Sequence, residues 1–334
     1  MSSLFSSSRL SSGLRQFAHL GTHLRFKAKE KLVYPLVDWQ RRRAAQFPYG
    51  EASPAQLTEI INQKEICIVG MRRSGNHAVL NWIRAQQPGD VCLLNNVAAG
   101  TNPYRYKSDN LLRYHPEHHK QAEVYRRQAN GELIKRDCLI YSYEDWSLGQ
   151  IVQPRFERNR DLYIGKSSKR FDLLVLRDPF NLFASRLKQN FVATKTKKLP
   201  MVDMWLEYAK EFTGESRYLK RQRICVNYNR WFSDLDYRKA LAAQLEIPFS
   251  DAGFDTISAF GGGSSFDGIG NSNGTSKAST LDVTNRWRQF ADEPTFQKLF
   301  ESEALWHYSE KIFGKLPGTD SFRVQRPTKI SLLS

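Results

Sequence analysis

Short apolar runs recur along this chain from residue 65 onward, and each has the length of a β-strand. They lie at residues 66–69, 91–94, 138–143, 173–176 and 224–228. The stretches between them have room for helices, as at residues 78–85, 181–190 and 201–212. Strands that alternate with helices predict an α/β fold, with a doubly wound parallel sheet flanked by helices. Ligands bind beyond the carboxyl ends of the strands in such sheets, so we expect the chemistry to lie there.

The loop after the first run has the spacing of a phosphate-binding loop. Gly70 and Gly75 match the GxxxxG pattern, in which backbone amides and a helix N-terminus attract anionic oxygens. A P-loop nucleotidase needs Lys and then Ser or Thr after the second glycine, and this chain has Asn76 and His77 there. The hydroxyl that would bind magnesium is missing, which disfavours hydrolysis of Mg·ATP.

Two arginines, Arg72 and Arg73, lie inside this loop. Guanidinium groups beside an amide-rich loop suit an anion that brings no metal, because arginine pairs with phosphate or sulfate oxygens in bidentate fashion. A basic surface turn after a strand is the alternative interpretation of the loop taken alone.

A second motif follows the run at residues 173–176. The run ends in Arg177, and Asp178-Pro179 then predicts a turn that starts a helix. In a helix that starts near Phe180, Ser185 lies in the second turn. Arg177 and Ser185 can then both face one phosphate above the end of the strand.

These two motifs resemble the nucleotide-binding motifs of sulfotransferases that use 3′-phosphoadenosine 5′-phosphosulfate (PAPS). Residues 73–77, Arg-Ser-Gly-Asn-His, are similar to the family's 5′-phosphosulfate loop, with Arg73 at its basic position. Asn76 and His77 stand where the family usually has threonine. Arg177 and Ser185 have the eight-residue spacing of the family's 3′-phosphate motif. The resemblance spans residues 65–315 and implies a P-loop NTPase-like sulfotransferase architecture.

The resemblance also implies a set of nucleotide contacts. The 5′-phosphosulfate would be bound by Arg72, Arg73, Ser74, Gly75, Asn76 and His77, and the 3′-phosphate by Arg177 and Ser185. Tyr228, at the end of the last apolar run, matches the tyrosine beside the adenine. Arg286 and Trp287 follow the glycine-rich stretch 261–274 and partly match the family's covering loop. The donor would be PAPS and the product PAP, with no metal required.

Sulfuryl transfer requires charge stabilisation and a proton acceptor. We expect Arg73 to stabilise the bridging oxygen of the departing nucleotide. Glu144 follows the run at 138–143 and is the predicted general base, with Asp145 and His77 as alternatives. The acceptor would be a hydroxyl or amine, with acidic carbohydrate, lipid, small phenol and peptide tyrosine all left open.

The chain has 50 Lys and Arg against 34 Asp and Glu, a formal net charge of +16. A positive field attracts anionic ligands, polyanions or acidic membranes. Two rival functions therefore remain: a P-loop-like nucleotide-binding protein or kinase relative without sulfuryl transfer, and a basic module that binds membranes or polyanions. Neither accounts for the Arg177–Ser185 spacing. No nucleic acid partner is expected.

Three regions are predicted along the chain. They are a basic extension (1–50), a sulfotransferase-like α/β domain (60–320) and a tail (321–334). Residues 1–29 have five Lys or Arg and no acidic residue, a composition shared by transit peptides, interfacial amphipathic helices and disordered tails. A cytoplasmic location is expected, with peripheral membrane contact through residues 1–29 and organellar targeting left open. No run approaches the ~18 apolar residues of a membrane span.

The four cysteines, at positions 67, 92, 138 and 225, have no CxxC spacing. Because they lie in or next to apolar runs, buried thiols are expected, in place of disulfides or zinc ligands. His115, His118 and His119 are close together, but no cysteine or carboxylate completes a metal site around them.

Overall fold

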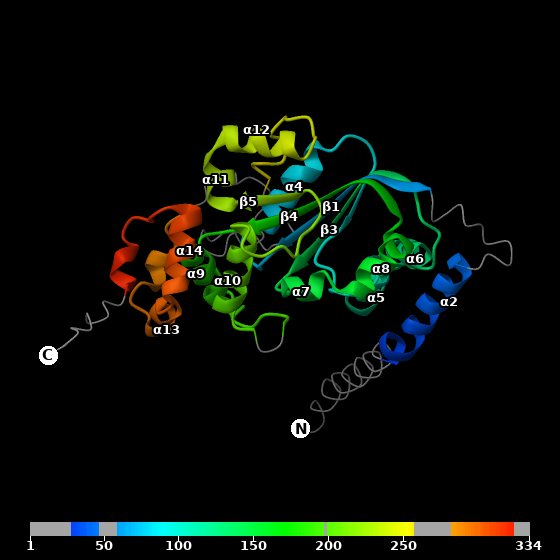
Figure 1. Cartoon of the computed structure of the whole chain (residues 1–334), viewed down its shortest axis with the longest axis horizontal. Coiled ribbons are helices and arrows are strands. Elements are labelled where there is room, and N and C mark those ends of the chain that lie inside the picture. The colour runs from blue at the N-terminus through cyan, green and yellow to red at the C-terminus, as the bar shows by residue number, and fades with distance from the viewer. Residues whose placement is uncertain (1–27, 47–58, 197–198, 257–281, 324–334) are drawn as a thin grey trace, which may run out of the picture. The chain divides into compact units, whose positions relative to one another are not determined.

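The computed structural model of the chain describes residues 28–46, 59–196, 199–256 and 282–323 (Figure 1). The expectations for residues 1–27, for the glycine-rich stretch 261–274 and for residues 324–334 lie outside the described residues. None of the described helices is long and apolar enough to cross a bilayer.

Five strands form one parallel sheet in the order β2-β3-β1-β4-β5. They are β1 (Ile60–Gly70), β2 (Val91–Leu94), β3 (Arg136–Glu144), β4 (Lys166–Leu176) and β5 (Arg223–Asn227). The predicted α/β class with a parallel sheet is thus confirmed. The last strand ends one residue earlier than expected, at Asn227, because the Asn227 side chain accepts from the Arg230 N–H and so caps a helix that begins at Tyr228.

The strand order locates the ligand-binding edge. β1 is central, the chain moves from it to one side of the sheet for β2 and β3, and then crosses to the other side for β4 and β5. Such a reversal opens a crevice at the carboxyl ends of the central strands. The loops after β1, β3 and β4 meet at this edge.

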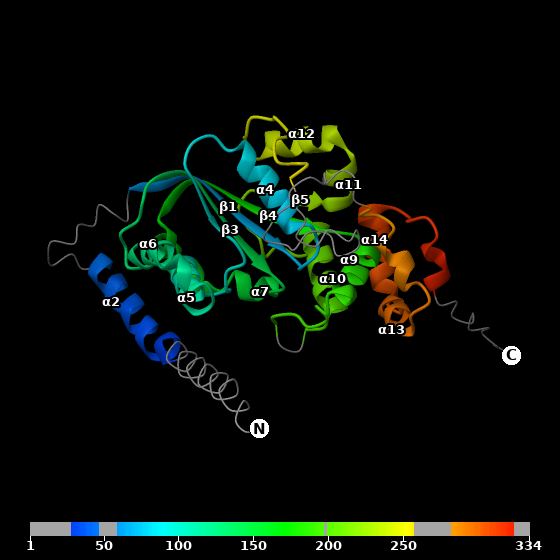
Figure 2. The ribbon, with the colours of Figure 1, turned by 180° about the vertical axis from the view of Figure 1, so that it is seen from behind.

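Helices cover both faces of the sheet. The helices outside residues 1–63, 100–135 and 154–168 are α4 (Asn76–Gln86), α7 (Leu148–Ile151), α9 (Pro179–Lys188), α10 (Met201–Phe212), α11 (Tyr228–Ser233), α12 (Leu235–Gln244), α13 (Pro294–Gln297) and α14 (Glu303–Phe313). The same part of the chain has the short helical turns η5 (Arg286–Phe290), η6 (Lys298–Phe300) and η7 (Thr319–Phe322). Figures 1 and 2 show α11 and α12 beside α4 on one face, and α7, α9 and α10 on the other. Strands covered on both faces account for the continuous apolar runs.

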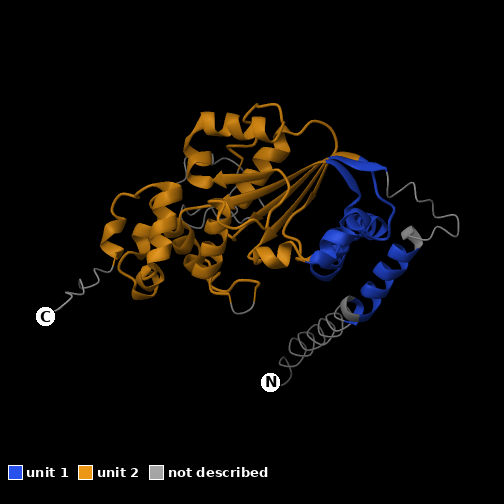
Figure 3. Ribbon diagram, in the orientation of Figure 1, with its two compact units in different colours: residues 1–63, 100–135, 154–168 blue, residues 64–99, 136–153, 169–334 orange. Residues whose placement is uncertain are grey.

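Two compact units make up the chain (Figure 3). Unit 1 comprises residues 1–63, 100–135 and 154–168, and unit 2 comprises residues 64–99, 136–153 and 169–334. The helices of unit 1 are η1 (Lys29–Val33), α2 (Tyr34–Gln46), α5 (Pro103–Tyr114), η2 (Pro116–His118), α6 (His119–Ala129) and α8 (Pro154–Ile164). The three regions drawn from the sequence stay a prediction.

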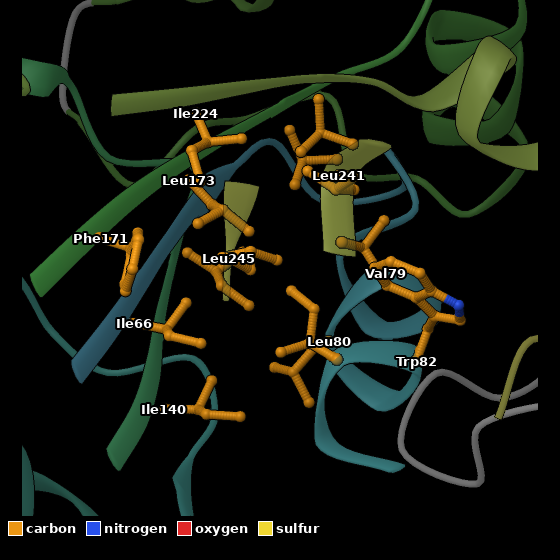
Figure 4. Packing of buried hydrophobic residues seen from close by; sticks show 14 of the residues in the cluster. Ile66, Val79, Leu80, Trp82, Ile140, Phe171, Leu173, Ile224, Leu241 and Leu245 are labelled. Atoms are coloured by element: carbon orange, nitrogen blue, oxygen red, sulfur yellow. The ribbon is translucent and has the colours of Figure 1, made fainter. Parts of the chain in front are cut away.

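The core of unit 2 lies between the sheet and α4 with α12 (Figure 4). Alternate strand residues face it, including Ile66 of β1, Ile140 of β3 and Leu173 of β4, and they pack against Leu80 and Leu241 of the two helices. The period of two follows from the pleat of the strands. This packing holds the ends of β1, β3 and β4 in place beside the start of α4.

The four cysteines are free thiols. Cys67 and Cys138 are buried as expected, while Cys92 and Cys225 are half-buried. Burial raises the pKa of Cys138 to about 12 and that of Cys225 to about 11. Thiols with such pKa values are poor nucleophiles at neutral pH.

Candidate active site

The loop between β1 and α4 makes a tight turn over residues 71–75. Arg73 and Gly75 both have positive φ angles, of 73° and 94°. A Cβ atom on Gly75 would lie 2.0 Å from a ring carbon of Tyr228. The position therefore requires glycine, both for its left-handed backbone and for the close approach of the ring.

The first turn of α4 offers backbone N–H groups next to this turn. Within the described part of the chain, the N–H groups of Gly75, Asn76 and His77 donate to no acceptor, whereas Gly75 O accepts from Ala78 and Val79. Unsatisfied amides at the positive end of a helix dipole favour an anion. Binding of a phosphate or phosphosulfate by these N–H groups stays a prediction.

The side chains of Ser74 and Asn76 are turned into the loop itself. The Ser74 hydroxyl lies 2.7 Å from Met71 O and 3.0 Å from Asn76 Oδ1. The Asn76 amide donates to Met71 O at 3.1 Å and lies 3.4 Å from Glu144 Oε1. These groups shape the loop, so a ligand would meet the backbone of both residues and not their side chains.

Arg73 brings the two predicted motifs together. Its Nε donates to Ser185 Oγ at 3.0 Å. Arg177 Nη1 in turn donates to Arg73 O at 3.3 Å. Burial lowers the pKa of Arg73, and the neighbouring Arg177 guanidinium lowers it further. Arg73 thus contacts two residues of the second motif that lie more than 100 positions further along the chain.

Arg177 is a buried cation that forms no ion pair within the described part of the chain. Only 2% of its surface is exposed, and its guanidinium donates to Arg73 O and Val283 O. Its Nε is buried and has no hydrogen-bond partner among the residues that the structure describes. Among the described residues no Asp or Glu pairs with it. An uncompensated buried charge is costly, and an anionic ligand would compensate it.

Tyr228 lies between the loop and Arg177. Its ring is buried against Gly75 and lies 5.4 Å from the Arg177 guanidinium. It stacks on Trp231 with the ring centroids 5.6 Å apart. The residue predicted beside the adenine is therefore next to both predicted phosphate contacts.

Arg286 and Trp287 are both buried in η5. Arg286 Nε donates to Asp282 O at 3.0 Å, and the Trp287 ring meets Phe322 edge-on at 5.4 Å. This segment reaches the site through Val283, whose carbonyl accepts from Arg177. Their predicted contact with nucleotide stays a prediction.

The other side of the loop is held by a buried ion pair that the sequence did not reveal. Arg186 donates to both carboxylate oxygens of Asp145, at 2.7 and 3.3 Å, and both side chains are buried. Arg186 also donates to Arg72 O at 3.1 Å, and Asp145 accepts from the Arg72 N–H at 2.9 Å. The pair thus clamps the loop backbone at Arg72. Its one sequence signal is that Arg186 directly follows Ser185 on α9.

Glu144, the predicted base, lies beside His77. His77 Nε2 is 3.4 Å from Glu144 Oε1 and 3.0 Å from Asn95 Nδ2. Arg72 Nε is 3.9 Å from Glu144 Oε2. Glu144 is buried while His77 is partly exposed. The histidine is the more accessible member of this pair.

Lys195 is a further residue of this side that the sequence did not single out. Its Nζ donates to Asn96 Oδ1, and its backbone N–H donates to Asp145 O at 2.9 Å. Burial, followed by the nearby Arg72, lowers the pKa of Lys195 to about 8. No group of three or more His, Cys, Asp or Glu side chains suited to a metal ion occurs in the described residues.

No protein-family model and no curated protein matches the chain. Two solved structures that it is similar to are sulfotransferases. One is the sulfotransferase domain of the olefin synthase from Synechococcus PCC 7002, with 13% identity over 78% of this chain and 98% of that chain, at a TM-score of 0.43. The other is the mouse sulfotransferase SULT7A1 complexed with PAP, with 13% identity over 59% of this chain and 63% of that chain, at a TM-score of 0.35.

Proposed function

We propose that the chain transfers a sulfuryl group from PAPS to a hydroxyl or amine acceptor, with carbohydrate among the candidates. The observation that supports this most is Arg177, a buried guanidinium that has no carboxylate partner among the described residues and lies beside Arg73 and Tyr228. A nucleotide with a 3′-phosphate would supply the missing negative charge there.

The donor would contact the protein at two places, one for its 5′-phosphosulfate and one for its 3′-phosphate. The 5′-phosphosulfate would accept from the N–H groups of Gly75, Asn76 and His77, which are otherwise unpaired within the described residues. The 3′-phosphate would lie near Arg177 and Ser185, with the adenine near Tyr228. Since neither the Ser74 hydroxyl nor the Asn76 amide faces away from the loop, the arrangement suits a donor that brings no magnesium ion.

The reaction would be an in-line displacement at sulfur. The acceptor oxygen or nitrogen forms a bond to sulfur while the bond from sulfur to the bridging phosphate oxygen breaks, and PAP departs with the electron pair. Arg73 would stabilise the negative charge that develops on the bridging oxygen. Arginine keeps its proton, so Arg73 acts by charge and hydrogen bonding alone.

The acceptor proton would leave through His77 and Glu144. His77 is the more exposed of the two, and its Nε2 lies 3.4 Å from the carboxylate. Glu144 would orient the imidazole and stabilise it once protonated. Glu144, predicted as the base, thus serves in this proposal together with His77.

Ligand-induced stabilisation tests the nucleotide assignment. A ligand at 100 times its dissociation constant adds about 2.7 kcal/mol to the free energy of unfolding. We expect PAP to raise the melting temperature of the full-length protein, and Mg·ATP and 5′-AMP to leave it nearly unchanged. The Arg177→Met variant should lose about half of the PAP shift or more, and the control Arg84→Ala, at an exposed arginine on α4, should keep all of it.

The outcomes separate the rival functions. A shift with Mg·ATP and none with PAP would favour a kinase relative. A PAP shift without transfer of labelled sulfate from PAPS to any hydroxyl or amine in an acceptor panel would favour a nucleotide-binding protein. Both results contradict the proposed transfer.

A further inference from the structure

The helix formed by η1 and α2 is fixed to unit 1 by one face. Tyr34 donates to Asp109 at 2.6 Å, and Asp38 pairs with Arg105 at 2.9 Å. Arg41 donates to two backbone carbonyls of the unit, at 2.7 and 2.9 Å. These contacts recur every three to four residues, so they define an inner face of the helix.

The outer face of the same helix is apolar and exposed. Leu32, Leu36 and Trp39 are 73%, 55% and 52% exposed, and Val33 lies beside them. Their spacing places them on the side of the helix away from Tyr34, Asp38 and Arg41. We name these four residues the outer stripe. A stripe of large apolar side chains of this kind marks an interaction surface.

Basic residues flank the outer stripe at both ends. Lys29 precedes it, and Arg43 follows it with its guanidinium 5.4 Å from the centre of the Trp39 ring. From Lys29 to Arg43 the helix extends about 21 Å at 1.5 Å per residue. Residues 1–46 have nine Lys or Arg and two acidic residues, of which Asp38 is directed into unit 1. The surface is therefore apolar along its centre and positive at its ends.

We propose that the outer stripe docks this protein onto a lipid surface with anionic headgroups. Apolar residues with an interfacial tryptophan suit the acyl boundary, and lysine and arginine suit the headgroups. A second copy of the chain is a poorer occupant. In an antiparallel pair of these helices, Lys29 of one copy would face Arg43 of the other, which is repulsive. The inference is independent of the sulfuryl transfer proposed above.

Flotation with vesicles tests the docking surface. Full-length protein is mixed with phosphatidylcholine vesicles that contain or lack phosphatidylserine, at low and at physiological salt. We expect binding to the phosphatidylserine vesicles, weakened at least tenfold by Leu36→Glu. The matched control is Leu235→Glu on α12, a leucine that is 46% exposed in unit 2, which should change binding less than twofold. Unaltered melting temperatures of both variants show that they fold.

Three results would overturn the proposal. If the wild-type protein does not float with the phosphatidylserine vesicles, it does not bind a lipid surface. If the Leu36→Glu variant floats with the vesicles as well as the wild type does, the protein binds lipid through another surface. Wild-type protein that is dimeric by light scattering, and that Leu36→Glu makes monomeric, has a second copy on the stripe. The PAP shift is unaffected in all three cases, so the proposed transfer is tested separately.

Discussion

Arg72 and Arg73 are neighbours in the sequence, but the two sides of the loop on which they lie differ in charge. On the Arg72 side, Glu144 and Asp145 lie within 3.9 Å of its guanidinium, and the buried Asp145–Arg186 pair holds its backbone. On the Arg73 side, the neighbours include Ser185 and Arg177, whose guanidinium donates to Arg73 O.

This difference separates a structural part of the loop from the part that we propose binds the nucleotide. On the Arg72 side, Glu144 and Asp145 already balance the charges of Arg72 and Arg186, and these contacts hold the loop backbone in place. Around Arg177, where the described residues provide no carboxylate, positive charge is left for an anion to balance. Two adjacent arginines are thus expected to respond differently to mutation.

The largest expected effect is on stability, at Asp145. Asp145→Ala leaves the buried Arg186 charge without its partner, which should lower the free energy of unfolding by about 3–5 kcal/mol. Urea denaturation measures it. Glu144→Gln is the matched control, because its contact with the partly exposed Arg72 should contribute less than about 1 kcal/mol. Equal losses in the two variants would contradict a structural role specific to the buried Asp145–Arg186 pair.

Arg73→Ala should have the next largest effect, on turnover. Removing a donor aimed at the developing charge typically lowers kcat by about 10²–10³, or about 3–4 kcal/mol. The readout is transfer of labelled sulfate from PAPS to an accepted substrate. Arg72→Ala should lower kcat less, because carboxylates already balance that charge. Near-normal turnover of Arg73→Ala would contradict the proposal that Arg73 stabilises the charge that develops during transfer.

Arg177→Met separates ligand binding from stability. A hydrogen bond to a charged group contributes about 1.5–3 kcal/mol, so PAP affinity measured by calorimetry should fall about 10- to 150-fold. The ligand-free variant should unfold no more easily than the wild type, because a buried cation without a carboxylate partner has been removed. If Arg177→Met were destabilised as much as Asp145→Ala, the Arg72 and Arg73 sides of the loop would not differ in the way described.

The smallest expected effect concerns pH and Lys195, on the Arg72 side. Its folded pKa of about 8 lies below the ordinary 10.5. Between these values the unfolded chain binds more protons than the folded one, so stability rises with pH. From pH 7 to pH 9 the wild type should gain about 1 kcal/mol relative to Lys195→Met. Parallel denaturation midpoints of the two proteins over this range would show that Lys195 is not buried as described.

The sheet could be predicted because its strands are covered on both faces. Such strands appear in the sequence as continuous apolar runs, so residues 66–69 and 173–176 predict strands. The amino-terminal halves of β1 and β4 are polar, as at Asn62, Lys64 and Lys169, so the observed strands are longer than the runs.

The three residues that meet beside the loop could be predicted for a different reason. Arg73, Arg177 and Ser185 follow strands at characteristic spacings, so local sequence is enough to find them. The Asp145–Arg186 pair joins residues 41 positions apart, and only the folded chain brings them together. The burial that shifts Lys195 likewise comes from tertiary packing and leaves no local pattern.

Three aromatic side chains beside the loop, Tyr228, Trp231 and Trp82, contact one another in a row. Tyr228 touches Gly75 and stacks on Trp231, which meets Trp82 edge-on with the ring centroids 6.1 Å apart. A charged ligand between the loop and Arg177 would therefore change the electric field at an indole one ring away. Intrinsic fluorescence should report the occupancy of this site in real time, without any attached dye.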